Sequence, residues 1–166
     1  MRTLAFAAFA ALIASSALAQ EPVGCDKFKW PVDREITALR APDPKPIASG
    51  ADIAALPLAV KIGLKTPNEA DLPTPPERAP KDGTFTGYLS SKGVAAGTYS
   101  IALSAPAWLD IVQNGQFLKA KSFSGVQGCD GIRKVVKFEL TGEPFTLQIS
   151  GVAANSIAVT LMSAAD

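Results

Sequence analysis

Residues 97–121 read GTYSIALSAPAWLDIVQNGQFLKAK, and this stretch decides the fold class. Apolar side chains occupy alternate positions within it, first at Tyr99, Ile101 and Leu103 and then at Leu109 and Ile111. A two-residue period is typical of a strand with one buried face. The pair Asn114-Gly115 follows the second alternation, and Asn-Gly favours the type I′ turn of a β-hairpin. We therefore predict antiparallel strands here, with a hairpin that joins 108–113 to 116–121.

The same alternation recurs on both sides of this stretch. Further apolar segments with this pattern lie at 85–89, 132–140, 145–149 and 157–161. Turn-forming residues separate the segments, at Gly93, Gly97, Pro106, Gly125, Gly142 and Asn155. Short strands at such intervals, with no helical period between them, indicate an all-β protein. We predict a single antiparallel β-sandwich of jelly-roll type.

The chain before residue 84 contains one more strand and two proline-rich stretches. Residues 56–64 alternate Leu56, Leu58, Val60, Ile62 and Leu64, which predicts a strand, and Pro57 favours a place at a sheet edge. Residues 66–81 hold five prolines among charged residues and predict an extended surface loop. Residues 41–50 hold three prolines and a Ser-Gly pair, which is also the composition of a loop.

The first residues of the chain have the order of a secretory signal peptide. Met-Arg-Thr precedes an apolar run at 4–14, and Ala17-Leu18-Ala19 provides a small-residue cleavage site. The run is too short to span a bilayer core of about 30 Å, and no later segment approaches about 20 consecutive apolar residues. Gln20 stands after the cleavage site, where a lipoprotein requires cysteine. We predict a periplasmic or secreted protein with no lipid anchor and no membrane span.

A short helix is predicted after the signal peptide. Pro31 or Asp33 supplies a helix start, and Ile36 and Leu39 are spaced to face one side. The predicted organisation is a signal peptide over 1–19, an N-terminal segment with this helix over 20–50 and the sandwich over 51–166.

The composition of the chain excludes several kinds of catalytic, metal and nucleic-acid-binding site. The chain has 16 basic and 15 acidic residues, and removal of the signal peptide takes away Arg2 and leaves equal numbers. A net charge near zero gives no electrostatic case for nucleic acid. The chain has no histidine. This absence excludes histidine bases, Ser-His-Asp and Cys-His nucleophiles, histidine-containing zinc sites and two-histidine iron sites. No Asp-x-Asp-x-Asp spacing suggests calcium, so no metal or cofactor is predicted.

The two cysteines, Cys25 and Cys129, predict one disulfide. An exported chain meets an oxidising compartment, where a cysteine pair is normally bridged. Each cysteine lies between a glycine and an aspartate, residue types that suit a turn. Redox-active or metal-binding pairs have closer spacing such as Cys-x-x-Cys, which is absent. The bridge is expected to pin the N-terminal segment onto the sandwich.

Two resemblances accompany these patterns. The segments 97–103, 108–112, 114–115, 137–140 and 145–151 resemble the strand succession of pre-peptidase C-terminal-type sandwiches, over residues 84–162 as a whole. That resemblance implies a non-catalytic secreted domain. Residues 25–35 and 128–134 resemble a family of small, uncharacterised exported proteins of Gram-negative bacteria. This second resemblance implies a periplasmic location and supplies no catalytic residue.

The two tryptophans are the first candidates for binding. An exposed Trp stacks on a sugar ring or anchors a partner protein. Trp108 is expected to share a strand face with Asp110, and a Trp beside a carboxylate is an arrangement suited to sugars. The structural alternative is that Trp30 closes the end of the sandwich near the disulfide and that Trp108 caps a strand edge.

A second candidate site follows from the disulfide. Bridging residues 25 and 129 is expected to bring Asp33, Arg34 and Glu35 near Arg133 or Lys134. The alternative is a surface salt-bridge cluster that fixes the helix, worth about 0–1 kcal/mol for each exposed pair. A basic strip is a third candidate, for anionic polysaccharide or lipid headgroups, and comprises Lys119, Lys121, Arg133, Lys134 and Lys137. Solvated strand faces and edge protection by lysine explain the same residues.

The leading hypothesis is a non-catalytic exported binding or accessory module of the bacterial envelope. Its expected contact surface is Trp108, Asp110 and the 125–134 loop, and its expected partners are glycans or another envelope protein. One alternative is a histidine-free, carboxylate-dependent hydrolase that acts on glycans, which requires two facing carboxylates. The other is a structural envelope protein that assembles through edge strands.

Overall fold

The computed structural model describes residues 21–42 and 44–164, so the predicted signal peptide lies outside the described residues. Two helical segments come first, η1 (Cys25–Lys27) and α1 (Asp33–Leu39). The strands follow in chain order as β1 (Lys45–Ala48), β2 (Leu58–Gly63), β3 (Phe85–Ser91), β4 (Gly97–Leu103), β5 (Trp108–Gln113), β6 (Gln116–Phe117), β7 (Ser122–Gly125), β8 (Lys134–Leu140), β9 (Phe145–Val152) and β10 (Ser156–Ser163). Among the helices of the described ranges, none has the length and apolar character needed to cross a membrane.

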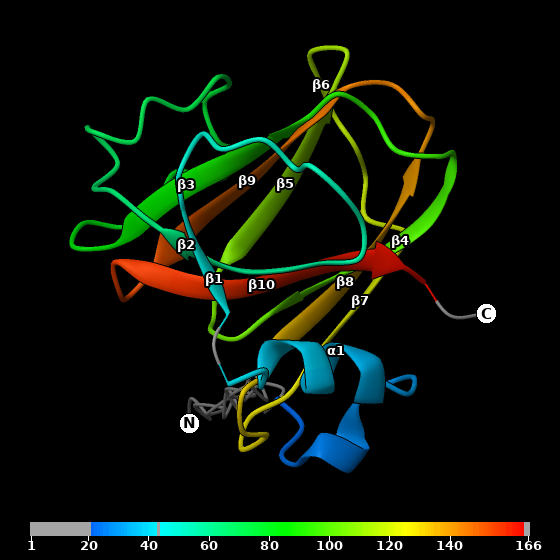
Figure 1. The fold of residues 1–166 in the computed structure, drawn as a ribbon. Helices are drawn as coiled ribbons and strands as arrows, with labels where there is room; N and C mark the ends of the chain where they lie inside the picture. Colours follow the sequence, from blue (N-terminus) through cyan, green and yellow to red (C-terminus); the bar gives the residue numbers. More distant parts are fainter. Residues whose placement is uncertain (1–20, 43, 165–166) are drawn as a thin grey trace, which may run out of the picture.

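Two sheets pack face to face (Figure 1). The larger sheet has the strand order β1-β2-β10-β4-β8-β7, and the smaller has the order β3-β9-β5-β6. From β2 to β5, and again from β8 to β10, the chain alternates between the sheets, which is the connection of a jelly roll. The predicted all-β sandwich is therefore confirmed. β1 and β7 extend the larger sheet at its two edges, and β1 runs parallel to β2.

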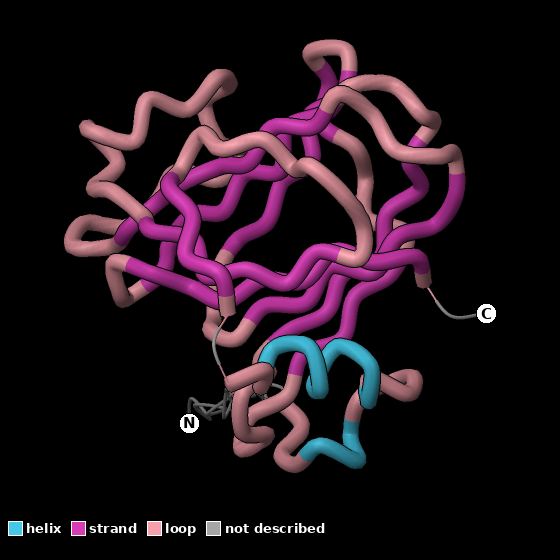
Figure 2. Tube along the Cα trace, viewed as in Figure 1, coloured by secondary structure: helices cyan, strands magenta, loops and turns pink. Residues whose placement is uncertain are grey.

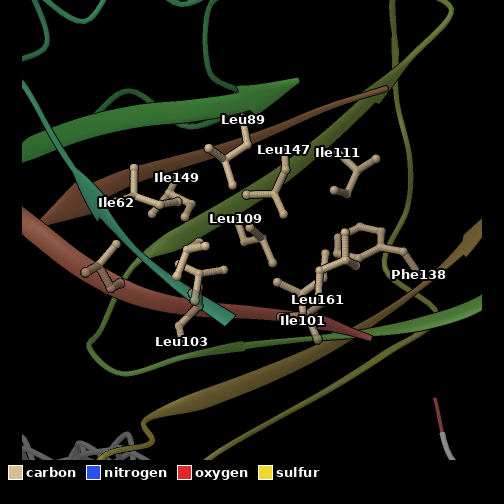
Figure 3. Packing of buried hydrophobic residues seen from close by; sticks show 14 of the residues in the cluster. Ile62, Leu89, Ile101, Leu103, Leu109, Ile111, Phe138, Leu147, Ile149 and Leu161 are labelled. Atoms are coloured by element: carbon tan, nitrogen blue, oxygen red, sulfur yellow. The ribbon is translucent and has the colours of Figure 1, made fainter. Parts of the chain in front are cut away.

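The main core fills the space between the sheets. Alternate residues of the longer strands point into it, as the sequence pattern requires, and side chains such as Ile101 and Leu147 are fully buried. Each such side chain contributes about 1.5–3 kcal/mol relative to an exposed position. Figure 3 shows this packing, with Leu89, Leu109, Ile111, Leu147 and Ile149 from the smaller sheet and Ile101, Leu103, Phe138 and Leu161 from the larger.

The N-terminal segment covers the outer face of the larger sheet, so that both helical segments lie outside the sandwich (Figure 2). Val32 and Leu39 are buried there in a second, smaller cluster with Ala102 of β4 and Val135 of β8. The predicted helix is confirmed. The predicted disulfide is confirmed too, since Cys25 and Cys129 are bonded with their Cα atoms 4.8 Å apart.

The proline-rich stretch at 41–50 differs from the prediction. It was expected to be a loop, but it contains β1. An edge strand tolerates the missing amide of Pro46, because one side of such a strand needs no hydrogen bonds. Since β1 occupies the edge, the prediction that β2 is an edge strand is wrong, and β2 lies between β1 and β10. Pro57 precedes β2 and is not part of it.

The Asn-Gly hairpin forms as predicted, but its second strand is shorter. Asn114 and Gly115 have φ angles of 51° and 72°, the positive values that a type I′ turn needs. β6 ends at Phe117, whereas residues 116–121 were expected to form one strand. The chain leaves the smaller sheet here, because the amide of Lys121 already donates to Lys137 of the larger sheet at 2.8 Å. The next strand, β7, was not predicted.

The proline-rich loop at 66–81 lies against the outer face of the smaller sheet. The amide of Thr74 donates to Oε1 of Gln148 at 3.2 Å, and the amide of Glu77 donates to Oδ2 of Asp110 at 3.1 Å. Asp110 alternates along β5 with buried core residues, so its side chain points away from the core. The predicted surface loop is present, and it is held by polar side chains of the sheet below it.

Candidate functional site

The two sheets separate along one side and leave a cleft of about 610 Å³. β6 pairs only with Val112 and Gln113 of β5, so among the described residues no strand lies beside the Trp108–Asp110 half of β5 on this side. β7 and β8 form the opposite wall, and residues 117–120 cross between the sheets and line the cleft as well. The short β6 is therefore the reason that the sandwich opens here.

Most of the cleft is apolar. Val136 and Phe138 of β8 are almost fully buried and lie deepest, whereas Phe117 and Phe123 are 37% and 58% exposed. Phe123 and Val136 are cross-strand partners, so both side chains face the cleft. Across the described ranges, the exposed large hydrophobic residues are Val23, Phe117 and Phe123. Two of these three therefore line this cleft, which marks it as an exposed apolar surface.

Trp108 and Asp110 form a fixed polar pair at one end of the cleft. The indole Nε1 of Trp108 donates to Oδ1 of Asp110 at 2.7 Å, while Oδ2 accepts from the amide of Glu77. Burial raises the pKa of the Asp110 carboxyl, and these two hydrogen bonds oppose that rise. Each carboxylate oxygen therefore accepts one hydrogen bond from the protein itself. Asp110 thus holds the indole ring of Trp108 and the proline-rich loop in place.

Two cations contact the ring of Trp108. The guanidinium of Arg78, from the proline-rich loop, and the Nζ of Lys134, from β8, each lie 5.5 Å from the ring centroid. Contacts of this kind contribute about 0.5–1 kcal/mol at exposed sites and more when desolvated. The indole therefore links the smaller sheet to the larger one across the mouth of the cleft.

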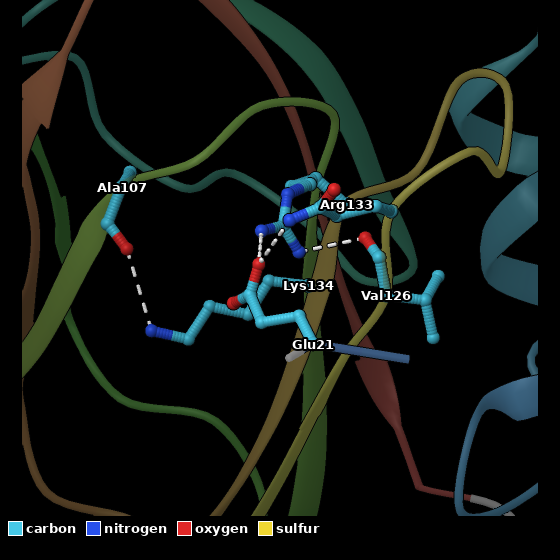
Figure 4. A network of polar contacts seen from close by, with 6 residues as sticks. Glu21, Ala107, Val126, Arg133 and Lys134 are labelled. Carbon is cyan, nitrogen blue, oxygen red and sulfur yellow. Dashed lines mark hydrogen bonds and ion pairs between the residues drawn. The ribbon is translucent and has the colours of Figure 1, made fainter. Parts of the chain in front are cut away.

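Lys134 is the central cation of this region. It has the same alternation as Val136 and Phe138, so it occupies an inward-facing position at the start of β8. Its Nζ donates to the carbonyl of Ala107 at 3.3 Å (Figure 4), and within the described residues it forms no ion pair. Burial lowers the pKa of Lys134, and the charge of neighbouring Arg133 lowers it further, while the carboxylates of Glu21 and Asp110 act in the opposite direction.

A second hollow of about 350 Å³ adjoins the cleft, and Phe123 and Lys134 line both. We call it the basic hollow, because four cations and one carboxylate are among its lining residues, which are Glu21, Pro22, Lys27, Lys29, Pro106, Ala107, Phe123, Ser124, Gly125, Arg133 and Lys134. In Figure 4 the carboxylate of Glu21 meets the guanidinium of Arg133, which also donates to the carbonyl of Val126 at 2.6 Å.

The candidate residues predicted from the sequence fall into two groups. Trp108, Asp110 and Lys134 lie together at the cleft, with Arg133 beside them in the basic hollow. Trp30 lies elsewhere, in the cluster under the N-terminal segment, where the Nζ of Lys137 is 4.8 Å from its ring centroid.

The predicted site that joins Asp33, Arg34 and Glu35 to Arg133 and Lys134 does not assemble. The disulfide brings residues 25 and 129 together, but α1 then crosses the outer face of the sheet toward β10. Arg34 consequently donates to the carbonyl of Ser163 at 3.4 Å, and buried Glu35 accepts from the hydroxyl of Ser100 at 2.6 Å.

The predicted basic strip is also divided. Lys121 pairs with Glu139 at 2.8 Å, which together with Thr98 lowers the pKa of the Glu139 carboxyl. Lys137 contacts Trp30, on the outer face of the same sheet. Of the strip, Lys119 and Lys134 line the cleft, while Arg133 lines the basic hollow with Lys134.

The sequence patterns did not single out Phe117, Phe123 or Glu77, which also line the cleft. Phe117 was expected within the 116–121 strand and Glu77 within the proline-rich loop, whereas Phe123 fell in no predicted element. The adjacent pair Phe117-Leu118 breaks the two-residue alternation, and that break was the available signal for an apolar surface outside the core.

Comparison of the chain with protein-family models, with curated protein sequences and with solved structures finds no match. Both resemblances noted from the sequence remain predictions. Within residues 21–42 and 44–164, no three acidic or cysteine side chains come together as metal ligands would. The function is therefore argued from the cleft and its side chains.

Proposed function

We propose that this protein is a non-catalytic exported binding module of the bacterial envelope, and that the cleft is its ligand-binding site. The observation that carries the proposal is the cleft, whose volume of about 610 Å³ lies within the range of about 300–1,000 Å³ for small-molecule sites. Its apolar lining with a few convergent polar groups is the usual composition of such sites. The signal-like N-terminus and the disulfide support an exported location.

The carboxylates of the cleft favour binding over hydrolysis. Asp110 and Glu77 both line it, so a pair of acidic groups is present. A glycosidase requires an acid that protonates the leaving oxygen and a second carboxylate that acts on the sugar. The oxygens of Asp110 are instead bonded to Trp108 and to the amide of Glu77. This arrangement supports an anchoring role for Asp110.

A ligand screen tests this proposal. The disulfide-bonded protein is scanned by thermal shift with glycan fragments, anionic amphiphiles and neutral amphiphiles, and positive results are repeated by calorimetry. A ligand specific for the folded state at about 100 times its Kd stabilises that state by about 2.7 kcal/mol. We expect at least one class to raise the unfolding temperature.

Three variants locate the binding, and the first two are a matched pair. Ala120→Phe places a ring in the cleft, whereas Ala153→Phe places the same ring in the exposed turn between β9 and β10. Phe117→Ser removes an exposed ring at the cleft without touching the buried core. The first and third changes should weaken binding, and the second should leave it unchanged. Binding that survives both cleft variants would show that the ligand sits elsewhere.

A further inference from the structure

The cleft and the basic hollow differ in charge, although they share Phe123 and Lys134. In the cleft, Lys119 and Lys134 are matched in number by Glu77 and Asp110. In the basic hollow, the cations Lys27, Lys29, Arg133 and Lys134 outnumber the single carboxylate of Glu21. We call the cleft and the basic hollow together the trough. The end of the trough at the basic hollow is thus cationic, and the end at the cleft is apolar with balanced charge.

Two of the cations in the hollow are available for a ligand. Lys27 pairs with Asp26 at 2.8 Å, and Arg133 pairs with Glu21. Lys29 and Lys134 form no ion pair within the described part of the chain. The Nζ of Lys29 lies 5.0 Å from the centroid of Phe123, the ring that stands between the hollow and the cleft.

The apolar part begins directly beside these amines. From Lys134, the inward face of β8 continues to Val136 and Phe138, and Phe123 lies across from Val136 on β7. Leu118 lines the same cleft from the connection between the sheets. An apolar chain laid along this surface would remove water from Phe117, Leu118 and Phe123, which are partly exposed, and each of its buried methylenes would add to the binding free energy.

We propose that the trough binds a free fatty acid, with the carboxylate in the basic hollow between Lys29 and Lys134 and the hydrocarbon chain in the cleft. The proposal rests on the proposed function, because it assigns a ligand class to the same cleft. A carboxylate would give Lys134 a direct ion pair, which it does not form within the described residues, and charge-assisted hydrogen bonds are the stronger kind. The phenyl ring of Phe123 would contact the first carbons of the chain.

Calorimetry with straight-chain acids tests the assignment. Hexanoate, octanoate, decanoate and dodecanoate are titrated below their micelle concentrations, with dodecanol as the uncharged probe of equal length. We expect affinity to rise about fourfold for each added methylene while the chain still fits the cleft. Dodecanoate should bind about tenfold more tightly than dodecanol, as one charge-assisted contact predicts.

Variants separate the head from the chain. Lys134→Met and Lys29→Met keep the aliphatic stems and remove the charges, and Lys92→Met removes an exposed lysine from the turn after β3 as the control. Loss of the Lys134 charge should weaken dodecanoate binding about tenfold and leave dodecanol binding unchanged. Unfolding curves confirm that each variant folds.

The outcomes distinguish this assignment from the proposed function. If dodecanol binds as tightly as dodecanoate and Lys134→Met changes neither affinity, the anionic head is refuted, while the cleft remains a binding site. If a glycan binds at the cleft and no acid does, the ligand class is refuted alone. If no probe binds at the cleft, both proposals fail.

Discussion

Reduction of the Cys25–Cys129 disulfide should release the N-terminal segment before the sandwich unfolds. The bridge joins residues 104 positions apart, and the chain-entropy model gives about 4.7 kcal/mol for a loop of that length. The segment 21–42 contributes no residue to the core between the sheets, because Val32 and Leu39 belong to the separate outer cluster. Local release is therefore possible without opening the main core.

Besides the contacts of Glu21, Arg34 and Glu35, main-chain hydrogen bonds still hold the segment once the bridge is broken. The amide of Gly24 donates to the carbonyl of Gln127 at 2.8 Å, and the amide of Lys29 donates to the hydroxyl of Ser124 at 3.1 Å. Such hydrogen bonds contribute about 0.5–1.5 kcal/mol each. Burial of the outer cluster is opposed by the entropy of ordering the segment, about 1–2 kcal/mol for each backbone residue. The free energy of global unfolding should therefore fall by less than the full loop value.

Hydrogen exchange measured by mass spectrometry provides the assay. After reduction, peptides that cover α1 should lose protection, while peptides that cover β4 and β9 should keep it. The double variant Cys25→Ala/Cys129→Ala should give the same pattern without reductant, and alanine avoids placing an unpaired hydroxyl at the buried Cys129 position. Simultaneous loss of protection in β4 and β9, or full retention in α1, would refute the reasoning.

Three further predictions concern the core and the polar contacts. Leu147→Ala empties a fully buried core position and should cost about 2–5 kcal/mol in urea unfolding; a smaller change would contradict the assigned packing. Asp110→Ala leaves the Trp108 indole N–H without its acceptor and should cost about 1–3 kcal/mol by the same assay, so an unchanged midpoint would argue against this anchor. Hydrogen bonds from Gln127 and Arg133 lower the pKa of Glu21, so its stabilising effect should be present above its unfolded pKa and be lost as the pH falls through the folded value; an NMR titration of that carboxyl at its ordinary pKa would contradict the pairing.

Strand alternation and turn residues predicted most of the fold because they depend on interactions between residues that are near in the sequence. The alternation through β4, β5 and β9 fixed which side chains enter the core, and the Asn114-Gly115 pair predicted its turn. β1 escaped prediction because its pairing with β2 overrides an unfavourable proline composition. The end of β6 escaped as well, because the crossing between sheets depends on tertiary contacts that no local pattern records.

The candidate site was predicted in part. The leading hypothesis placed Trp108, Asp110 and the 125–134 loop, which includes Lys134, on one contact surface, but it named neither the phenylalanines of the cleft nor Glu77. β5 and β8 belong to opposite sheets, and their approach across the open side depends on the register of the whole jelly roll. The disulfide correctly joined residues 25 and 129, but it did not determine the direction in which α1 continues from that point.

Binding at the cleft can be tested most directly with the two indole N–H signals of the chain. Trp108 lines the cleft, and Trp30 lies in the outer cluster, so the second indole is an internal control. The measurement is a titration of nitrogen-15-labelled protein with dodecanoate, followed by NMR. We predict a saturable shift of the Trp108 indole signal with an unchanged Trp30 signal. A shift confined to Trp30, or saturable backbone shifts that leave Trp108 and β8 unaffected, would contradict the assignment of the cleft as the binding site.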